Sequence, residues 1–157
     1  MADDIFRITV DEPNYSRVLG TPPEDSLLED AGLLDFRQSR LWAQKGSEEG
    51  EQVYAAIESG DGLLFYKVQR GHAEDEGRYV GVGRVGETKR LTEEQAETLF
   101  HTPLARLAYT VTDFEPISKS IVDVETVLGY GSYPQSSHRV TDDRYSSVDS
   151  ALQTLSE

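Results

Sequence analysis

Two apolar runs separated by one polar loop constrain the fold of this chain more than any other feature. The first run is GLLFYKV at residues 62–68, and the second is YVGVGRV at residues 79–85. Short runs rich in Val, Leu and aromatic residues are typical of buried strands. The loop at 70–78 is rich in Gly, Glu and Asp, so we predict a hairpin of two central strands. Gly81 and Gly83 permit the second strand to bend or to approach another chain segment closely, or they mark a bulge.

Further strands and helices flank this hairpin along the sequence. Alternation of apolar and polar residues predicts strands at 5–10 and 107–112. Helices with one apolar face are predicted at 21–34, 47–60 and 92–100, and the last of these begins with the capping box Thr-Glu-Glu-Gln. The mixture of strands and helices predicts an α+β fold.

The length of 157 residues suits one domain with a single core. We predict this domain over residues 1–145, followed at 146–157 by a docked C-terminal helix or the start of a linker to a downstream domain. No apolar run is long enough to span a bilayer, and the first residues lack the pattern of a signal peptide. We therefore expect a cytoplasmic protein with no membrane partner.

The charge of the chain is strongly negative, with 29 acidic against 15 basic residues and a net charge of −14. A carboxylate-rich and lysine-poor composition is typical of proteins that stay hydrated in concentrated salt, where screening is short-ranged. We therefore expect a halophilic, archaeal source. Negative charge usually argues against nucleic-acid binding, but in a salt-adapted protein the local distribution of Arg and Lys decides.

Residue types that support catalysis or metal binding are absent or scattered. The chain has no cysteine, which excludes disulfides, thiolate metal sites and cysteine nucleophiles. The three histidines lack ligand spacing, and carboxylates are so abundant that any pair is expected by chance. GVGRVG at 81–86 partly matches a dinucleotide-binding loop, but no βαβ pattern follows it. We expect no catalytic residue, no metal, no cofactor and no intrinsic enzymatic activity.

The most informative block runs from Gln38 to Val85. It contains the single Trp of the chain, then a short helix, then Gly60-Asp61, and then the two apolar runs. This order, W … helix … GD-x-LLFY … YVGVGRV, resembles the core of the EVE family and, more distantly, of the YTH family. Both belong to the PUA-like superfamily, and the similarity covers about residues 36–115.

The resemblance implies a PUA-like α+β fold, in which a small, strongly curved sheet or partial barrel has flanking helices. It also implies a pocket that holds one flipped, modified base by stacking and by hydrogen bonds to the base edge. An aromatic residue at the position of Trp42 forms one wall of that pocket in these families, and Ala43 and Gln44 are then candidates to read the base edge. The second wall follows the glycine-bearing strand, where Phe100 and His101 are the candidates here.

Two alternatives remain open for the pocket residues. A lone Trp is also typical of a hydrophobic core, so a core position is the alternative for Trp42. Phe65 and Tyr66 alternate on one strand, so one of them belongs to the core and the other to the pocket or to solvent. Tyr66 carries a hydroxyl and is the better candidate for the pocket.

Two further segments are candidates to contact the nucleic-acid backbone. Three basic residues flank Trp42, and the stretch 129–143 contains only two acids among hydroxyl, amide and aromatic side chains. Hydroxyls, amides and Arg are the usual partners of phosphate oxygens. The alternatives are cations that balance nearby acids and an ordinary polar loop. The predicted backbone-contacting residues are Arg37, Arg40, Lys45, Tyr133, His138, Arg139 and Arg144.

The sequence therefore predicts a reader that flips and recognises a methylated base in DNA, either N6-methyladenine or a modified cytosine. RNA with a modified base is the competing substrate. The resemblance further implies the N-terminal specificity domain of a modification-dependent restriction protein, with a downstream nuclease or GTPase motor as partner domain or subunit. The rival hypothesis is a protein- or small-ligand-interaction domain on the same fold.

Overall fold

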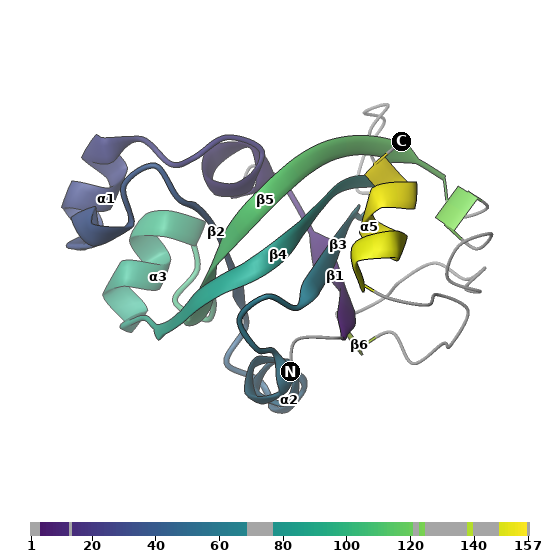
Figure 1. The fold of residues 1–157 in the computed structure, drawn as a ribbon. Coiled ribbons are helices and arrows are strands. Elements are labelled where there is room, and N and C mark those ends of the chain that lie inside the picture. Colours follow the sequence, from purple (N-terminus) through teal and green to yellow (C-terminus); the bar gives the residue numbers. More distant parts are fainter. Residues whose placement is uncertain are drawn as a thin grey trace. The chain divides into compact units, whose positions relative to one another are not determined.

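A computed structural model describes residues 4–12, 14–68, 77–120, 123–124, 138–139 and 148–156, with only the backbone described at 138–139. The chain divides into two compact units, each built from discontinuous segments. Unit 1 comprises Met1–Asp11, Glu58–Arg84 and Asp113–Glu157, and unit 2 comprises Glu12–Ile57 and Val85–Thr112. Two long strands, β4 (Arg78–Arg90) and β5 (Leu107–Lys119), contribute residues to both units (Figure 1).

Unit 1 contains a mixed sheet. Strand β1 (Ile5–Val10) runs parallel to β3 (Gly62–Lys67), and β3 is antiparallel to β4, which confirms the predicted hairpin. The short strand β6 (His138–Arg139) pairs antiparallel with β1. All six residues of β3 are buried, and it has a neighbouring strand on both sides. Burial on both faces explains why the sequence of β3 is an unbroken apolar run rather than an alternating one.

Gly81 of β4 lies beneath the aromatic ring of Phe114 on β5. A Cβ atom at position 81 would come within 2.6 Å of that ring. Phe114 also contacts Phe65, with 6.0 Å between the ring centroids. Gly81 therefore provides the close approach that the sequence predicted for a glycine of this strand.

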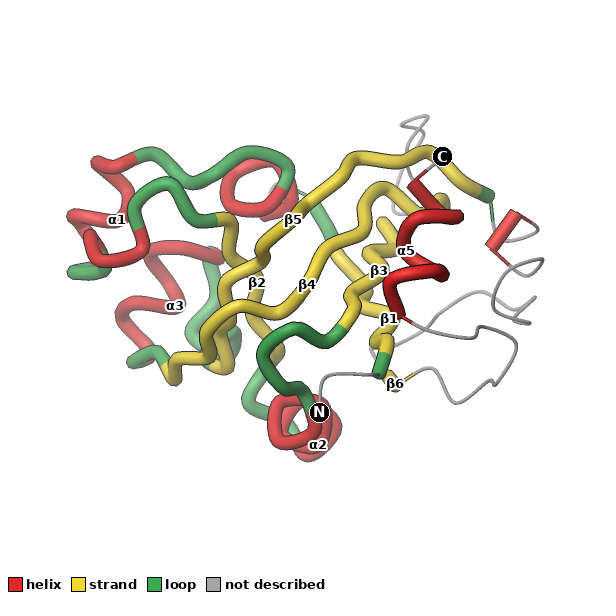
Figure 2. Tube along the Cα trace, in the orientation of Figure 1, coloured by secondary structure: helices red, strands yellow, loops and turns green. Residues whose placement is uncertain are grey.

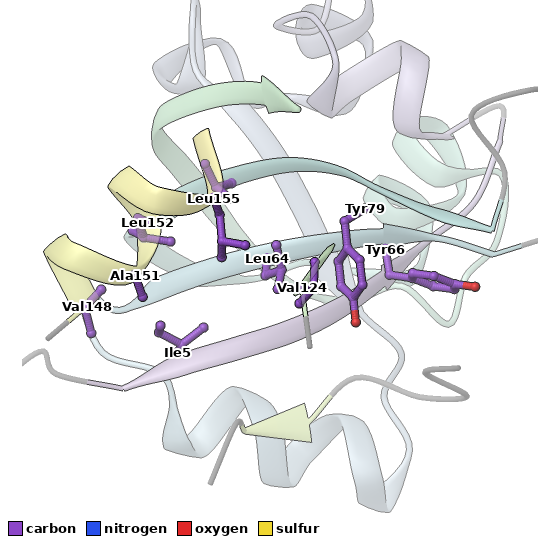
Figure 3. Close-up of a cluster of buried hydrophobic side chains, with 10 residues drawn as sticks. Ile5, Leu64, Tyr66, Tyr79, Val124, Val148, Ala151, Leu152 and Leu155 are labelled. Atoms are coloured by element: carbon purple, nitrogen blue, oxygen red, sulfur yellow. The ribbon is translucent and has the colours of Figure 1, made fainter. Parts of the chain in front are cut away.

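Helix α5 (Val148–Ser156) supplies the apolar cover for one face of the unit 1 sheet. Its buried residues recur at helical spacing, and Figure 3 shows them directed toward Ile5 and Leu64. Tyr66 and Tyr79 lie in the same cluster and contact each other edge to face, with 5.1 Å between ring centroids. The buried members of the cluster are Ile5, Leu64, Tyr66, Tyr79, Val82, Val124, Val148, Ala151, Leu152 and Leu155.

Asp61 joins the beginnings of β1 and β3. The carboxylate is 1% exposed, and it accepts hydrogen bonds from the backbone N–H of Glu58 at 2.8 Å and of Asp4 at 3.4 Å. Burial raises the pKa of Asp61, and the two backbone donors oppose this shift. The Gly-Asp pair of the sequence motif therefore has a structural role in unit 1.

Unit 2 combines part of the sheet with several short helices. Strand β2 (Arg40–Gln44) is antiparallel to the first half of β5, with Arg40 opposite Val111 and Gln44 opposite Leu107. Helix α1 packs against α3, and α2 and η1 pack against β2. Figure 2 shows these helices in red and the strands in yellow. The helices are η1 (Tyr15–Leu19), α1 (Asp25–Ala31), η2 (Leu34–Phe36), α2 (Glu48–Ala56) and α3 (Glu93–Phe100).

Local sequence signals set the ends of two of these helices. The capping box predicted for α3 is present, since Thr92 and Gln95 exchange side chain to backbone hydrogen bonds. The side-chain amide of Gln95 also donates to the carbonyl of Ala31 at 3.0 Å, which ties α3 to α1. Gly32 adopts a left-handed conformation with φ of 70°, so α1 ends at Ala31 and Leu34 falls in η2.

Two predicted strands are longer than the sequence indicated. The patterns ended at Val85 and Thr112, whereas β4 extends to Arg90 and β5 to Lys119. A hydrogen bond in unit 2 partly explains the extra length of β4. The N–H of Glu87 on β4 donates to Thr110 Oγ1 on β5 at 2.8 Å, and this bond holds polar residues of β4 against the neighbouring strand. Pairing between strands, rather than local composition, determines these ends.

Candidate nucleic-acid interface

Strand β2 places three of the predicted site residues within unit 2. Arg40, Trp42 and Gln44 alternate on one face of the strand, and Trp42 lies opposite Tyr109 of β5. Ala43 lies on the other face, opposite Ala108, and is 8% exposed. The two faces of β2 therefore have different environments.

The structure brings Trp42 and Phe100 into direct contact. Their ring centroids are 5.9 Å apart and their planes meet at 84°, which is an edge-to-face arrangement. Trp42 is 5% exposed and Phe100 is 3% exposed. The two residues predicted as opposite walls of a pocket thus form a closed aromatic pair in this structure.

Gln44 is held in place by a buried phenol. Its side-chain amide nitrogen donates to the hydroxyl oxygen of Tyr109 at 3.4 Å. Burial raises the pKa of Tyr109, and the hydrogen bond from Gln44 opposes this shift. Gln44 and Trp42 share a face of β2. The Gln44–Tyr109 pair therefore places an amide and a hydroxyl on the same face as the Trp42–Phe100 pair.

A cavity lies on the opposite face of β2 and β5, entirely within unit 2. Its empty volume is about 230 Å³ with its open mouth included. Apolar side chains dominate its walls, while Glu87 and Lys89 are exposed residues of β4. Because its empty volume includes open solvent, the cavity is a shallow apolar depression, smaller than typical small-ligand pockets of about 300–1,000 Å³. The lining residues are Leu33, Phe36, Leu41, Glu87, Lys89, Leu91, Leu99, Ala108, Tyr109 and Thr110.

The sequence alone did not reveal this cavity. Its apolar residues come from four separate stretches of the chain, and each stretch taken singly has the pattern of an ordinary core segment. Only the pairing of β2 with β5 and the packing of η2 and α3 bring them together. Nothing in the local sequence of any one stretch marks them as a group.

The three predicted cations around Trp42 all lie in unit 2. Arg37 follows η2 and is exposed, Arg40 begins β2 and is partly buried, and Lys45 is exposed just after the strand. The two exposed cations therefore stand near opposite ends of the strand that carries Trp42.

Tyr66, the remaining predicted pocket residue, belongs to unit 1. It is 3% exposed and belongs to the same buried cluster as the residues of α5, where it lies beside Tyr79 (Figure 3). Of the predicted backbone contacts in the second segment, His138 and Arg139 form β6, where Arg139 lies opposite Phe6. Tyr133 and Arg144 lie outside the described residues.

The described part of the chain offers neither a metal site nor a membrane-spanning helix. Among the described residues, no group of three or more His, Asp or Glu side chains is arranged to hold a metal ion. No described helix has the length and apolar character needed to cross a membrane.

Comparisons with known proteins identify the fold. No protein-family model matches the chain, and a search of curated proteins finds no significant match. Among solved structures, the chain is similar to the N-terminal domain of Thermococcus gammatolerans McrB bound to m5C DNA. That likeness has a TM-score of 0.63 at 20% sequence identity, and it covers 90% of this chain and 92% of that chain.

Two other solved structures are similar at lower scores. ASCH from Zymomonas mobilis has a TM-score of 0.50 at 9% identity, over 98% of this chain and 96% of that chain. Human THYN1 protein, in complex with DNA containing 5-methylcytosine, has a TM-score of 0.49 at 10% identity, over 98% of each chain. The likeness to the McrB domain confirms the predicted PUA-like α+β fold.

Proposed function

We propose that this chain is a reader domain that binds DNA containing a modified base, and that methylated cytosine is the preferred modification. The observation that carries this proposal is the likeness, over nine-tenths of both chains, to the McrB N-terminal domain bound to m5C DNA. A base reader needs aromatic surface for stacking and polar groups for the base edge. Unit 2 has both next to each other on β2.

The base is bound, in this proposal, where Trp42, Phe100 and Gln44 meet. Stacking on Trp42 provides the wall, and the amide of Gln44 or the backbone at Ala43 reads the base edge. Because Trp42 is 5% exposed, binding requires the edge-to-face contact with Phe100 to open. Tyr66 lies in the core cluster of unit 1, so the proposed site consists of unit 2 residues.

Phosphate contacts come from the cations near β2, with Arg37 and Lys45 exposed at its two ends. His138, Arg139, Tyr133 and Arg144 remain predicted contacts of the second segment. Each phosphate contact that a substitution removes lowers the dependence of log K on log salt by about one unit. Replacing Arg139 and Arg144 with Ala therefore tests that segment separately from Arg37 and Lys45.

The proposed function is tested by the fluorescence of the protein itself, since Trp42 is the only Trp. Duplexes that differ only in one 5-methylcytosine, one N6-methyladenine or neither are titrated at low and high salt, together with a matched RNA. We expect the 5-methylcytosine duplex to bind most tightly and to quench Trp42. Equal affinity for all duplexes contradicts the reader function, and tight binding without any change in fluorescence removes Trp42 from the site.

Substitution of Trp42 gives the corresponding affinity measurement. Stacking on one base contributes about 1–3 kcal/mol, so Trp42→Leu is expected to weaken binding of the modified duplex tenfold or more. Trp42→Phe keeps an aromatic face and retains most of the affinity. Tyr54→Leu, at a partly exposed aromatic residue of α2 that contacts Arg90, is the matched control and leaves affinity unchanged.

Recognition in this proposal involves no cleavage. Stacking and edge hydrogen bonds suffice for binding, whereas phosphodiester cleavage usually needs metal-activated water. We propose that a downstream nuclease or GTPase motor supplies any cleavage, as in a modification-dependent restriction system. Nicking of modified DNA by the purified chain with Mg²⁺ or Mn²⁺, lost on replacing one of its own carboxylates, contradicts this assignment.

A second candidate function is the rival from the sequence, a small-ligand-binding domain on the same fold, and it is tested at the shallow apolar depression behind β2. Ala108 lines it and is 4% exposed, so Ala108→Val reduces its volume without touching Trp42. If the second candidate is right, this variant loses ligand binding and keeps DNA binding unchanged. A loss of DNA affinity instead shows that the cavity, not the face of Trp42, receives the base.

A further inference from the structure

One loop of unit 2 presents a large apolar side chain to solvent. Of the large hydrophobic side chains in the described part of the chain, two are exposed, Leu104 at 56% and Leu34 at 40%. Leu104 lies in the segment that joins α3 to β5. This segment begins after Phe100, which contacts Trp42, and it ends at Leu107, which lies opposite Gln44. The loop is therefore attached at both ends to the proposed base-binding residues.

The backbone of Leu104 is held by three hydrogen bonds. Its carbonyl accepts from the N–H of Gly46 at 2.8 Å and from the N–H of Arg106 at 2.9 Å. Its own N–H donates to Thr102 Oγ1 at 3.3 Å. The residue before Leu104 is Pro103, whose ring fixes its own φ angle. These bonds hold the backbone on both sides of Leu104. The loop conformation that exposes its side chain is therefore stabilised by the loop's own hydrogen bonds.

Two cations accompany this leucine. Gly46 contacts the guanidinium group of Arg106 so closely that a Cβ atom there would come within 2.8 Å of Arg106 Nη2. Lys45, the residue before Gly46, is exposed. The carboxylates of Glu48 and Glu49 follow on α2, and that of Glu51 is paired with Arg90. The leucine therefore stands beside two cations, Lys45 and Arg106, that have the carboxylates of α2 next to them. Arg90 lowers the pKa of Glu51 most, and the charge of Arg106 lowers it further.

We infer that Leu104 is a wedge that enters the base stack of duplex DNA where the modified base leaves it, with Lys45 and Arg106 on the flanking phosphates. This inference rests on the proposed reader function. Flipping a base costs unstacking and leaves a gap, and proteins that distort duplexes insert Leu, Ile, Met, Phe or Pro at such steps. The position of the loop between Phe100 and Leu107 brings the wedge beside the base that Trp42 receives.

The wedge is tested on three DNA substrates that carry the same 5-methylcytosine. The first substrate is a duplex in which 5-methylcytosine is paired with guanine. The second is a duplex in which 5-methylcytosine faces an abasic site, and the third is a single strand. Leu104→Ala is expected to weaken binding of the paired duplex about tenfold and to leave the single strand unchanged, because only the paired duplex needs its stack opened. Leu34→Ala, at the other exposed leucine of unit 2, is the matched control and binds all three as wild type does.

A fluorescent base gives an independent readout. With 2-aminopurine next to the modified cytosine, wild-type protein is expected to raise the fluorescence by unstacking that base, and Leu104→Ala is expected to raise it less. Equal binding of the paired duplex by wild type and Leu104→Ala overturns the wedge. An equal loss on all three substrates also overturns it, since Leu104 would then be a general contact.

Failure of the proposed function has a different signature. In that case wild-type protein binds each of the three substrates no more tightly than the same DNA with an unmethylated cytosine. Because Leu104 is exposed, both Leu104→Ala and the more polar Leu104→Ser are expected to unfold at the same urea concentration as wild type. The two variants therefore report on binding rather than on folding.

Discussion

The two units of this chain use their large side chains differently. In unit 1, α5 covers one face of the sheet, and ten buried residues form a continuous apolar cluster. In unit 2, Trp42 packs against Phe100 and Gln44 donates to the buried Tyr109. A shallow apolar depression is left open there, and Leu104 is exposed on a hydrogen-bonded loop. Under the proposed function, unit 2 supplies the binding surface and unit 1 mainly stabilises the fold.

The strongest test of this contrast is Leu64→Ala in unit 1. Leu64 is fully buried in the α5 cluster, and removal of a buried leucine costs about 2–5 kcal/mol of unfolding free energy. Urea unfolding measures this loss, and Leu34→Ala in unit 2 is the control because it is exposed. The affinity of the folded protein for modified DNA is expected to stay unchanged. A drop in affinity as large as that of Trp42→Leu contradicts the division of roles.

Asp61 gives the next largest expected effect, again in unit 1. Asp61→Ala leaves the N–H groups of Glu58 and Asp4 without their acceptor, which costs about 1–3 kcal/mol. Asp61→Asn keeps one acceptor oxygen and is expected to lose less. Urea midpoints of the two variants at pH 7 separate these contributions.

The pH dependence of the same variants checks the role of burial. Burial raises the pKa of Asp61 in the folded state above its ordinary value of 3.8, so the folded state holds this proton more tightly than the unfolded chain does. Protonation of Asp61 therefore adds stability below the ordinary pKa, and this contribution is lost as the pH rises through the folded pKa. Asp61→Asn is expected to remove this part of the pH dependence. An unchanged profile in Asp61→Asn shows that the carboxylate is solvated in the folded state.

The smallest effect is expected on the surface of unit 2. Arg90 donates two hydrogen bonds to Glu51 at 2.8 and 2.9 Å, and it lies 5.1 Å from the ring centroid of Tyr54. Arg90 lowers the pKa of Glu51, but both side chains are exposed and the attraction is screened by salt. Arg90→Gln is expected to leave the urea midpoint unchanged in high salt. A shift as large as that of Asp61→Ala shows that the unit 2 surface contributes to stability as much as the unit 1 core.

Elements with strong local signals were predicted well from the sequence. The capping box at Thr92 and the unbroken apolar run of β3 identified α3 and the central hairpin, because both depend on residues close together in the chain. Elements that depend on pairing partners were predicted less well. The polar end of β4 after Val85 is a strand because β5 lies beside it, and no local pattern contains that information.

The structure brings only some of the predicted site residues together. Trp42 and Phe100 were named as partners from the sequence resemblance, and the structure brings them into contact. Whether a base binds between them stays a prediction. Leu104 was missed because a leucine within a polar loop looks like an ordinary loop residue. Its exposure and its hydrogen bond to Gly46 depend on a segment more than fifty residues away in the sequence.

The discontinuous make-up of the two units also sets an order in which they can be completed during synthesis. All segments of unit 2 have been made once Thr112 has been added, whereas unit 1 still lacks α5 until Ser156. A nascent chain that ends between these points therefore has a complete unit 2 and an uncovered apolar face around Ile5 and Leu64. Exposed faces of this kind make partly synthesised chains prone to aggregation. We expect the docking of this nine-residue helix to end that vulnerable interval.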